Sequence, residues 1–291
     1  MLSRSIKTFV QKNWLLRESL RLLRTRQIVL LEYPVKSRPR YGHGHPPHAE
    51  LYDIIASGRA TYADWLRRFL AFREQFLQIA VHARPDAEEP AWVNGYLPRP
   101  DAVALYGLLA TSNPRRYFVV GSGYSTKFAR RAIRDHRLQT AITSIDPQPR
   151  AEIDALADTV IRQPLETIDT GCFGELEAGN ILFFDGSHRC FMNSDVTVFF
   201  LEVLPRLKAG VLVHIHDIVL PCDYPPEYVN RYYSEQYLLA AYLQARGTAF
   251  EIILPNAFIA DDPELRDILA PLWRDLDFRD VRGCSFWIRK T

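Results

Sequence analysis

Seven short apolar segments, separated by stretches of helical pattern, constrain the fold of this chain more than any other feature. Helical patterns lie between several of them, at Ser125–His136, Val196–Leu207 and Glu235–Ala245. Apolar strands that alternate with helices are typical of a parallel sheet covered on both faces. We therefore predict a doubly wound α/β fold with ligands at the carboxyl ends of its strands. The apolar segments are Tyr117–Val120, Ala141–Ile145, Thr159–Ile161, Ile181–Phe184, Val211–Ile215, Phe250–Leu254 and Ser285–Ile288.

The first hundred residues have a different pattern. A helix is predicted from Thr61, as N-cap, to about His82, because its apolar residues recur at helical spacing. A proline-rich connector, Arg84 to Pro100, follows this helix. We expect residues 1–100 to form a mainly helical N-terminal extension and residues 101–291 to form the second domain.

Residues 1–26 carry seven lysines or arginines and one acid, Glu18, and their apolar residues again recur at helical spacing. Such a basic amphipathic helix either binds a membrane surface or an anionic partner, serves as a targeting segment, or packs on its own domain. A strand-like segment, Ile28–Pro34, comes next. His43, His45 and His48 then lie in a Gly- and Pro-rich loop, which is read either as a metal site or as a flexible connector without fixed ligand geometry.

Composition excludes several classes of protein. Hydrophobic residues make up 47% and charged residues 24% of the 291 residues, so a disordered or fibrous chain is not expected. A net charge of +2 argues against nucleic-acid binding. No apolar segment approaches the roughly 20 residues that span a bilayer. The four cysteines form no C-x-x-C pair, which favours neither a structural zinc nor a disulfide framework. We expect a cytoplasmic protein, with membrane association open through the basic helix.

Glycines follow the first strand and open the next helix, in the segment Gly121-Ser122-Gly123-Tyr124-Ser125-Thr126. They let the backbone turn tightly and approach a ligand. A dinucleotide-binding loop would have a third glycine where Thr126 stands, so a cofactor without a diphosphate is favoured. The second strand ends at Asp146, 25 residues after Gly121, where an acid can bind ribose hydroxyls. The alternative is that these residues only form turns.

Carboxylates and histidines follow the fourth and fifth strands. Asp185 and His188 come after one strand, and His214, His216 and Asp217 end the other. We expect His214 to be a core residue and the other two to contact ligand. The acids either hold a divalent cation that activates a substrate hydroxyl, or His188 acts as general base with an ordinary pKa. The remaining alternative is that these residues have no catalytic task.

Four segments together resemble the class I S-adenosylmethionine-dependent methyltransferases, and most closely a bacterial branch of the methyltransferase domain 24 type. They are FVVGSGYST at Phe118–Thr126, SIDPQPR at Ser144–Arg150, FDGSH at Phe184–His188 and GVLVHIHDI at Gly210–Ile218. The similarity extends over roughly residues 92–290. It implies a Rossmann-like seven-stranded sheet and S-adenosyl-L-methionine as cofactor.

The resemblance also implies roles for individual residues. Those expected to contact the cofactor are Gly121, Ser122, Gly123, Ser125, Thr126, Asp146, Leu165, Glu166 and Asp185. In the related catechol and caffeoyl-coenzyme A O-methyltransferases the two strand-end acids bind a divalent metal such as Mg²⁺, and Asp185 and Asp217 match them. His188 stands where those enzymes have a catalytic lysine. Val119 and Ile218 depart from the pattern, at a cofactor-binding acid and a metal-binding asparagine respectively.

The resulting hypothesis is methyl transfer to an oxygen, or to a nitrogen, of a small-molecule acceptor, with His188, Asp185, His216 and Asp217 as catalytic residues. One alternative is a metal-dependent oxygenase or hydrolase that uses His188, His216 and Asp217. The other is a cofactor-binding scaffold without catalysis. The proline- and tyrosine-rich segment Pro221–Tyr237 either covers the acceptor or packs the helix that follows it.

Overall fold

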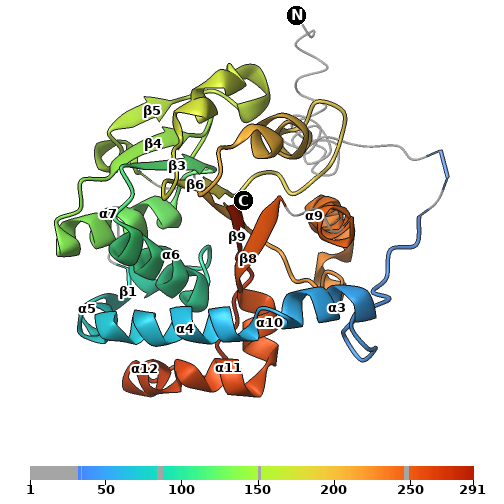
Figure 1. The fold of residues 1–291 in the computed structure, drawn as a ribbon, viewed down its shortest axis with the longest axis horizontal. Helices are drawn as coiled ribbons and strands as arrows, with labels where there is room; N and C mark the ends of the chain where they lie inside the picture. The colour runs from blue at the N-terminus through green and yellow to red at the C-terminus, as the bar shows by residue number, and fades with distance from the viewer. Residues whose placement is uncertain (1–31, 34, 84–87, 150–151, 246–248) are drawn as a thin grey trace, which may run out of the picture. The chain divides into compact units, whose positions relative to one another are not determined.

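The computed structural model describes residues 32–33, 35–83, 88–149, 152–245 and 249–291. Residues 39–291 form one compact unit (Figure 1). The basic segment 1–26 and most of the strand predicted at Ile28–Pro34 lie outside the described residues. Membrane association through the basic helix therefore stays a prediction, and so does a domain boundary near residue 100.

The core of the unit is a seven-stranded sheet with the strand order β5-β4-β3-β6-β7-β9-β8. Each strand lies within one or two residues of a segment predicted from the sequence, because long runs of buried apolar residues leave little choice of position. The α/β fold with seven strands is therefore confirmed. The strands are β3 (Arg116–Val120), β4 (Ala141–Ile145), β5 (Thr159–Ile161), β6 (Ile181–Phe184), β7 (Leu212–Ile215), β8 (Phe250–Pro255) and β9 (Phe286–Lys290).

The prediction of a parallel sheet is wrong for β9. This strand runs antiparallel to both of its neighbours, pairing His214 of β7 with Trp287, and Phe250 of β8 with Lys290. The usual signal of an antiparallel strand is alternation of apolar and polar residues. The first three residues of β9 are all buried, so the sequence carries no such alternation.

The parallel register brings four strand ends together. Val120 at the end of β3 pairs with Ile145 of β4 on one side and Phe184 of β6 on the other. Phe184 in turn pairs with Ile215 of β7. The segments that follow these four residues therefore leave the sheet at the same edge, as the sequence predicts for a binding crevice.

Helices cover the sheet and its edges (Figure 1). Among them, α6 packs against α7, and α9 contacts α3. The predicted helix at 196–207 is present but irregular, because α8 passes into a π-turn and then a 3₁₀ turn that contains Pro205, a residue without an amide hydrogen. The helices of this part are α6 (Arg99–Ser112), α7 (Tyr124–His136), α8 (Asp195–Val198), α9 (Glu235–Gln244), α10 (Asn256–Asp261), α11 (Pro263–Ile268) and α12 (Ala270–Asp275).

The N-terminal helices differ from the prediction. The structure has α3 (Ala49–Ala56), which the sequence analysis did not predict, and then α4 (Arg59–Phe69) and α5 (Arg73–Leu77) with a 3₁₀ turn between them. The helix predicted from Thr61 to His82 is thus broken, and it begins two residues earlier. Its last residues instead form β1 (Ala80–His82), which pairs with β2 (Ala91–Val93). Because α4 packs on α6, α11 and β8, these helices share the core of the compact unit.

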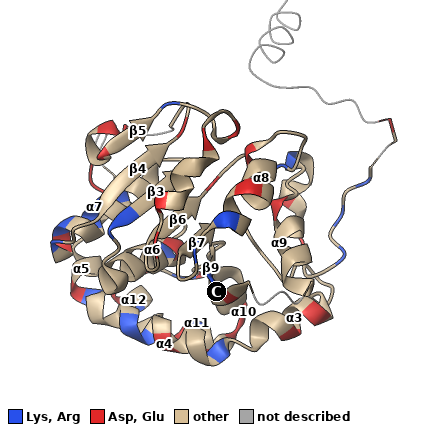
Figure 2. Cartoon of the chain, turned by 45° about the horizontal axis from the view of Figure 1, so that its top comes forward, with Lys and Arg blue, Asp and Glu red and all other residues tan. Residues whose placement is uncertain are grey.

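Charged residues of both signs lie mainly on the outer helices and loops, and the central strands carry few (Figure 2). The helices of the described residues include none that is both long and apolar enough to cross a membrane.

Candidate functional site

The glycine loop joins β3 to α7. Its first position, Gly121, has a backbone conformation and a close neighbour that only glycine tolerates. Its φ is +80°, in the left-handed region. A Cβ at this position would lie 1.8 Å from the carbonyl oxygen of Asp185, on the neighbouring strand end. The loop therefore passes directly over the end of β6.

Replacing Gly121 by alanine is expected to lower the free energy of unfolding by about 3 kcal/mol or more, or to prevent folding. Gly95→Ala is the matched control, because Gly95 also has a positive φ of +74° but nothing lies within 4 Å of its would-be Cβ. The control should lose only about 1 kcal/mol, the cost of the left-handed backbone. Urea unfolding of both variants checks this prediction, and equal losses would contradict the close approach to Asp185.

The first turn of α7 leaves room for a ligand. No side chain caps this helix at Gly123, and a Cβ built there would meet nothing within 4 Å. Ser125 and Thr126 are buried, and the Thr126 hydroxyl has no hydrogen-bond partner. A helix N-terminus attracts anionic groups such as the carboxylate of an amino acid. These features fit the methionine part of S-adenosylmethionine.

Asp146 lies beside the glycine loop. Its Oδ2 accepts a hydrogen bond of 2.8 Å from the Ser122 amide, and its Oδ1 accepts one of 2.7 Å from the Gln148 amide. Each carboxylate oxygen can accept a second bond, so both remain able to bind ribose hydroxyls. Leu165 and Glu166, expected near the adenine, lie in a 3₁₀ turn after β5, with Leu165 in the core and Glu166 half-buried. These contacts with cofactor stay predictions.

The acids and the histidine of the strand ends meet at one point. The Nε2 of His188 lies 3.3 Å from Asp185 Oδ1 and 3.5 Å from Asp217 Oδ2. Both His188 and Asp217 have positive φ, +60° and +51°, which is uncommon for residues with a side chain. Backbone strain of this kind gathers at functional sites, where the surrounding structure holds it in place. The sequence analysis correctly placed these three residues together.

Glu235, at the start of α9, joins His188 and the two aspartates as a fourth residue, and it was not predicted from the sequence. Its Oε2 lies 2.8 Å from His188 Nδ1, and the residue is completely buried. Burial raises the pKa of Glu235 to about 7, although the bond to His188 acts in the opposite direction. We call Asp185, His188, Asp217 and Glu235 the His188 cluster. Nothing in the sequence around residue 235 marks this glutamate, which faces His188 only through the packing of α9.

The surroundings of His188 change its expected protonation. Burial lowers the pKa of His188, but hydrogen bonds with Asp185 and Glu235 outweigh it and hold that pKa well above the usual 6.5. The surroundings of His188 therefore favour its charged form more than those of an ordinary histidine, for which the sequence alone predicts an unshifted pKa.

His214 of β7 and His216, just after it, are both buried. His214 is fully buried, hydrogen bonds with Ser285 Oγ at 2.6 Å and stacks on Phe183, which confirms the prediction of a core residue. His216 was expected at the edge of the strand as a ligand contact; it is 4% exposed, and its contact with ligand stays a prediction. Its Nε2 lies 3.8 Å from Cys284 Sγ, so the segment before β9 covers it.

The tyrosine-rich segment lies against the His188 cluster. The ring of Tyr233 is 4.6 Å from that of His188, and Tyr228 and Tyr224 pack around Tyr233. The amide of Ser234 donates to the His188 carbonyl at 2.8 Å. The segment Pro221–Tyr237 therefore borders the site and also contacts the start of α9. Both interpretations of it, a cover for the acceptor and a packing element for the following helix, are compatible with these contacts.

The histidine loop and the connector have structural contacts. His48 caps α3, and His43 Nε2 hydrogen bonds with the Asp223 carbonyl. Neither belongs to the metal-ligand group identified among the described residues. Trp92 of the connector is buried and donates to the Phe76 carbonyl.

Comparisons with known proteins find similarity to methyltransferases. Residues 118–218 match the family model of a methyltransferase domain, Methyltransf_24. The solved structure of the SAH-bound methyltransferase PaMTH1 of Podospora anserina is similar at 13% identity and a TM-score of 0.40, covering 86% of this chain and 100% of that chain. The O-methyltransferase from Bacillus cereus in complex with SAH has the same identity and TM-score, covering 78% and 90%. No curated protein matches this chain. The matched residues run from β3 to just beyond β7, and they include the glycine loop, Asp146 and every residue of the His188 cluster except Glu235.

Proposed function

Because the chain contains a methyltransferase domain over residues 118–218, we propose that it transfers a methyl group from S-adenosylmethionine to a hydroxyl oxygen of a small-molecule acceptor. The observation that supports this most is the meeting of the glycine loop, Asp146 and the His188 cluster at one edge of the sheet. A cofactor-binding surface and a group that can take a proton are thereby adjacent. Transfer to nitrogen is a less favoured variant of the same chemistry.

The residues present fit the cofactor in three ways. The uncapped first turn of α7 and the open space above Gly123 would hold its amino-acid part, and Asp146 would bind its ribose. The cofactor supplies an activated methyl group on a sulfonium. The protein must then orient the acceptor oxygen in line with that methyl group and remove its proton.

The His188 cluster is suited to taking that proton as a unit. Three carboxylates surround one imidazole at 2.8–3.5 Å, so their protons are shared and cannot be assigned to one residue. The acceptor hydroxyl donates toward the side of Nε2, where Asp185 and Asp217 lie. His188 keeps the charge of these carboxylates balanced, and Glu235 fixes the ring through Nδ1. Buried Tyr224 and half-buried Tyr228 and Tyr233 supply an aromatic wall for a small acceptor.

A magnesium ion at Asp185 and Asp217 is not supported by the donors present. Mg²⁺ prefers oxygen ligands in octahedral geometry. The Nε2 of His188 lies between the two carboxylates, and Ile218 offers no oxygen where related enzymes have asparagine. The proposed reaction therefore uses the side chains of the His188 cluster and no magnesium at this pair.

Calorimetric titration of the purified protein with S-adenosylhomocysteine, with and without Mg²⁺, tests the proposal. We expect binding with a dissociation constant on the order of micromolar, unchanged by Mg²⁺. Consumption of S-adenosylmethionine should then be measured against a panel of small phenols, catechols and sugars. Absence of binding in both conditions would overturn the proposal and favour the scaffold or the metal-dependent oxygenase. Binding that requires Mg²⁺ would restore the metal at Asp185 and Asp217.

A further inference from the structure

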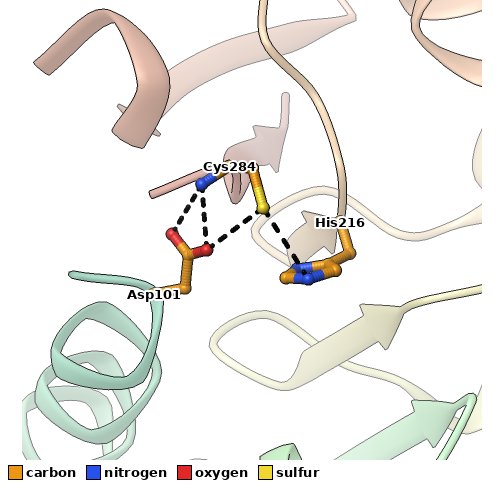
Figure 3. Close-up of side chains that lie close together, drawn as sticks. All are labelled: Asp101, His216 and Cys284. Carbon is orange, nitrogen blue, oxygen red and sulfur yellow. Dashed lines mark hydrogen bonds between the residues drawn. The ribbon is translucent and has the colours of Figure 1, made fainter. Parts of the chain in front are cut away.

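Asp101, His216 and Cys284 converge beside the His188 cluster from three distant parts of the sequence (Figure 3). Asp101 lies in the first turn of α6, His216 follows β7, and Cys284 precedes β9. Cys284 Sγ lies 3.5 Å from Asp101 Oδ2 and 3.8 Å from His216 Nε2. Ligand atoms around one tetrahedral zinc ion are separated by about 3.3–3.8 Å, given the usual metal–ligand bond lengths. The two separations from Cys284 Sγ fall in this range, and all three ligand atoms lie within 4.8 Å of one another, so that a small shift of the side chains would let them bind one ion.

The carboxylate of Asp101 is held in a fixed orientation. Its Oδ1 accepts hydrogen bonds from Asn256 Nδ2 at 2.8 Å and from the Ser285 amide at 3.0 Å. The Cys284 amide donates to Oδ2 at 2.9 Å, and Oδ2 also faces Cys284 Sγ. Hydrogen bonds that orient a ligand in this way are typical of metal sites.

The local charge also favours a cation. Asp101 is completely buried, and no lysine or arginine in the described part of the chain forms an ion pair with it or with Asp217. A buried carboxylate is costly unless it is hydrogen-bonded and a positive charge lies close by, and a metal ion would supply that charge. The Nδ1 of buried His216 has no hydrogen-bond partner, so this ring is not committed to another structural contact through that atom.

We propose that Asp101 Oδ2, His216 Nε2 and Cys284 Sγ bind one zinc ion. On binding, a zinc–sulfur bond forms, and the thiol proton is released to the solvent. The set of one carboxylate, one imidazole and one thiolate suits zinc and excludes magnesium, which binds oxygen ligands. Three protein ligands leave a fourth position for water, as in zinc sites that are open to a cleft.

The zinc would lie next to the proposed site of methyl transfer, but Asp185 and Asp217 would not be its ligands. Asp217 links the two groups, since its Oδ1 lies 3.3 Å from Cys284 Sγ and its Oδ2 faces His188. Cys284 is only half-buried, so part of this residue remains in contact with solvent. The proposal concerns metal binding alone and does not require that the protein be a methyltransferase.

Cobalt titration of the full chain, after removal of bound metals by dialysis against a chelator, tests this site. Co²⁺ substitutes for Zn²⁺ and gives a thiolate-to-cobalt absorption band only where sulfur is a ligand. We expect one Co²⁺ per chain and such a band, both displaced by Zn²⁺ and not by Mg²⁺. The band should disappear in Cys284→Ser, whose hydroxyl can still donate to Asp101. Cys190→Ser, which changes another half-buried cysteine of the same region, should retain it.

Three outcomes would overturn the proposal. They are no band in the unsubstituted protein, a band that survives Cys284→Ser, or Co²⁺ bound without a band, which would point to an oxygen site such as Asp185 and Asp217. Far-ultraviolet circular dichroism establishes that the variants fold, and an unfolded Cys284→Ser would be replaced by Cys284→Ala. Titration of the same samples with S-adenosylhomocysteine reports separately on the proposed function, so either can fail alone.

Discussion

Replacing His188 by alanine is expected to lower turnover by ~10²–10⁴-fold while the affinity for S-adenosylhomocysteine stays unchanged. The reason is that the imidazole holds the His188 cluster together. Without it, Asp185, Asp217 and Glu235 lose the imidazole that lies within 3.5 Å of each of them. Removal of the acceptor's proton should then slow, whereas the glycine loop and Asp146 remain in place. Methyl transfer to an acceptor found in the panel, together with calorimetry, provides the measurement.

His45→Ala is a suitable control, since His45 is an exposed histidine outside the site and its loss should change neither quantity. A thermal melt of both variants separates loss of turnover from loss of folding. If His188→Ala keeps its turnover with the acceptor, the His188 cluster takes no part in proton removal. If cofactor affinity falls together with turnover, the cluster instead supports the cofactor site.

Replacing Asp146 by alanine is expected to weaken binding of S-adenosylhomocysteine by about 10- to 100-fold. The variant loses the charged acceptor that would bind the ribose hydroxyls, and hydrogen bonds to charged groups contribute about 1.5–3 kcal/mol each. It also loses the acceptor for the Ser122 amide, which positions the glycine loop. Calorimetric titration measures the change directly.

Asp158→Ala is the matched control for this prediction. Asp158 also accepts a hydrogen bond from a strand amide, that of Ile142, and pairs with Arg130, but it lies at the amino ends of β4 and β5. Its loss should cost a comparable amount of stability and leave cofactor affinity unchanged. Equal affinity in Asp146→Ala and the unsubstituted protein would remove Asp146 from the cofactor site. Equal losses in both aspartate variants would indicate a general loss of structure.

Much of the site could be predicted because it follows directly from strand ends. Residues 121, 146, 185 and 217 each come within two positions of the last residue of a buried strand. Once the strands are recognised as parallel neighbours, the edge at which these residues gather is determined by the topology. The sequence therefore predicted both the place of the site and most of its polar members.

The residues of the two clusters that were not predicted from the sequence come from elements whose placement depends on tertiary packing. Glu235 begins α9, and its approach to His188 depends on the path of the tyrosine-rich segment. Asp101 and Cys284 belong to a helix and a loop whose neighbours are far away in the sequence. Helical or strand periodicity gives no distance between such elements, so neither contact could be predicted.

The pKa of His188 could likewise not be predicted from the residue type alone. A histidine has an ordinary pKa only when its surroundings are ordinary. Burial lowers the pKa of His188, but Asp185 and Glu235 outweigh this effect and raise it. The burial of His216 likewise depends on Cys284, which lies in the segment before the antiparallel strand β9 and covers the residue after β7.

By itself the sequence determined the α/β class, the seven strands and the edge of the sheet where the chemistry lies, because buried strands and glycine turns leave a local pattern. Tertiary structure alone decided the direction of β9, the break in the N-terminal helix, and the convergence of Glu235 on His188 and of Asp101 on Cys284. These features depend on which distant elements share a core, and that choice is made by the packing of the whole unit.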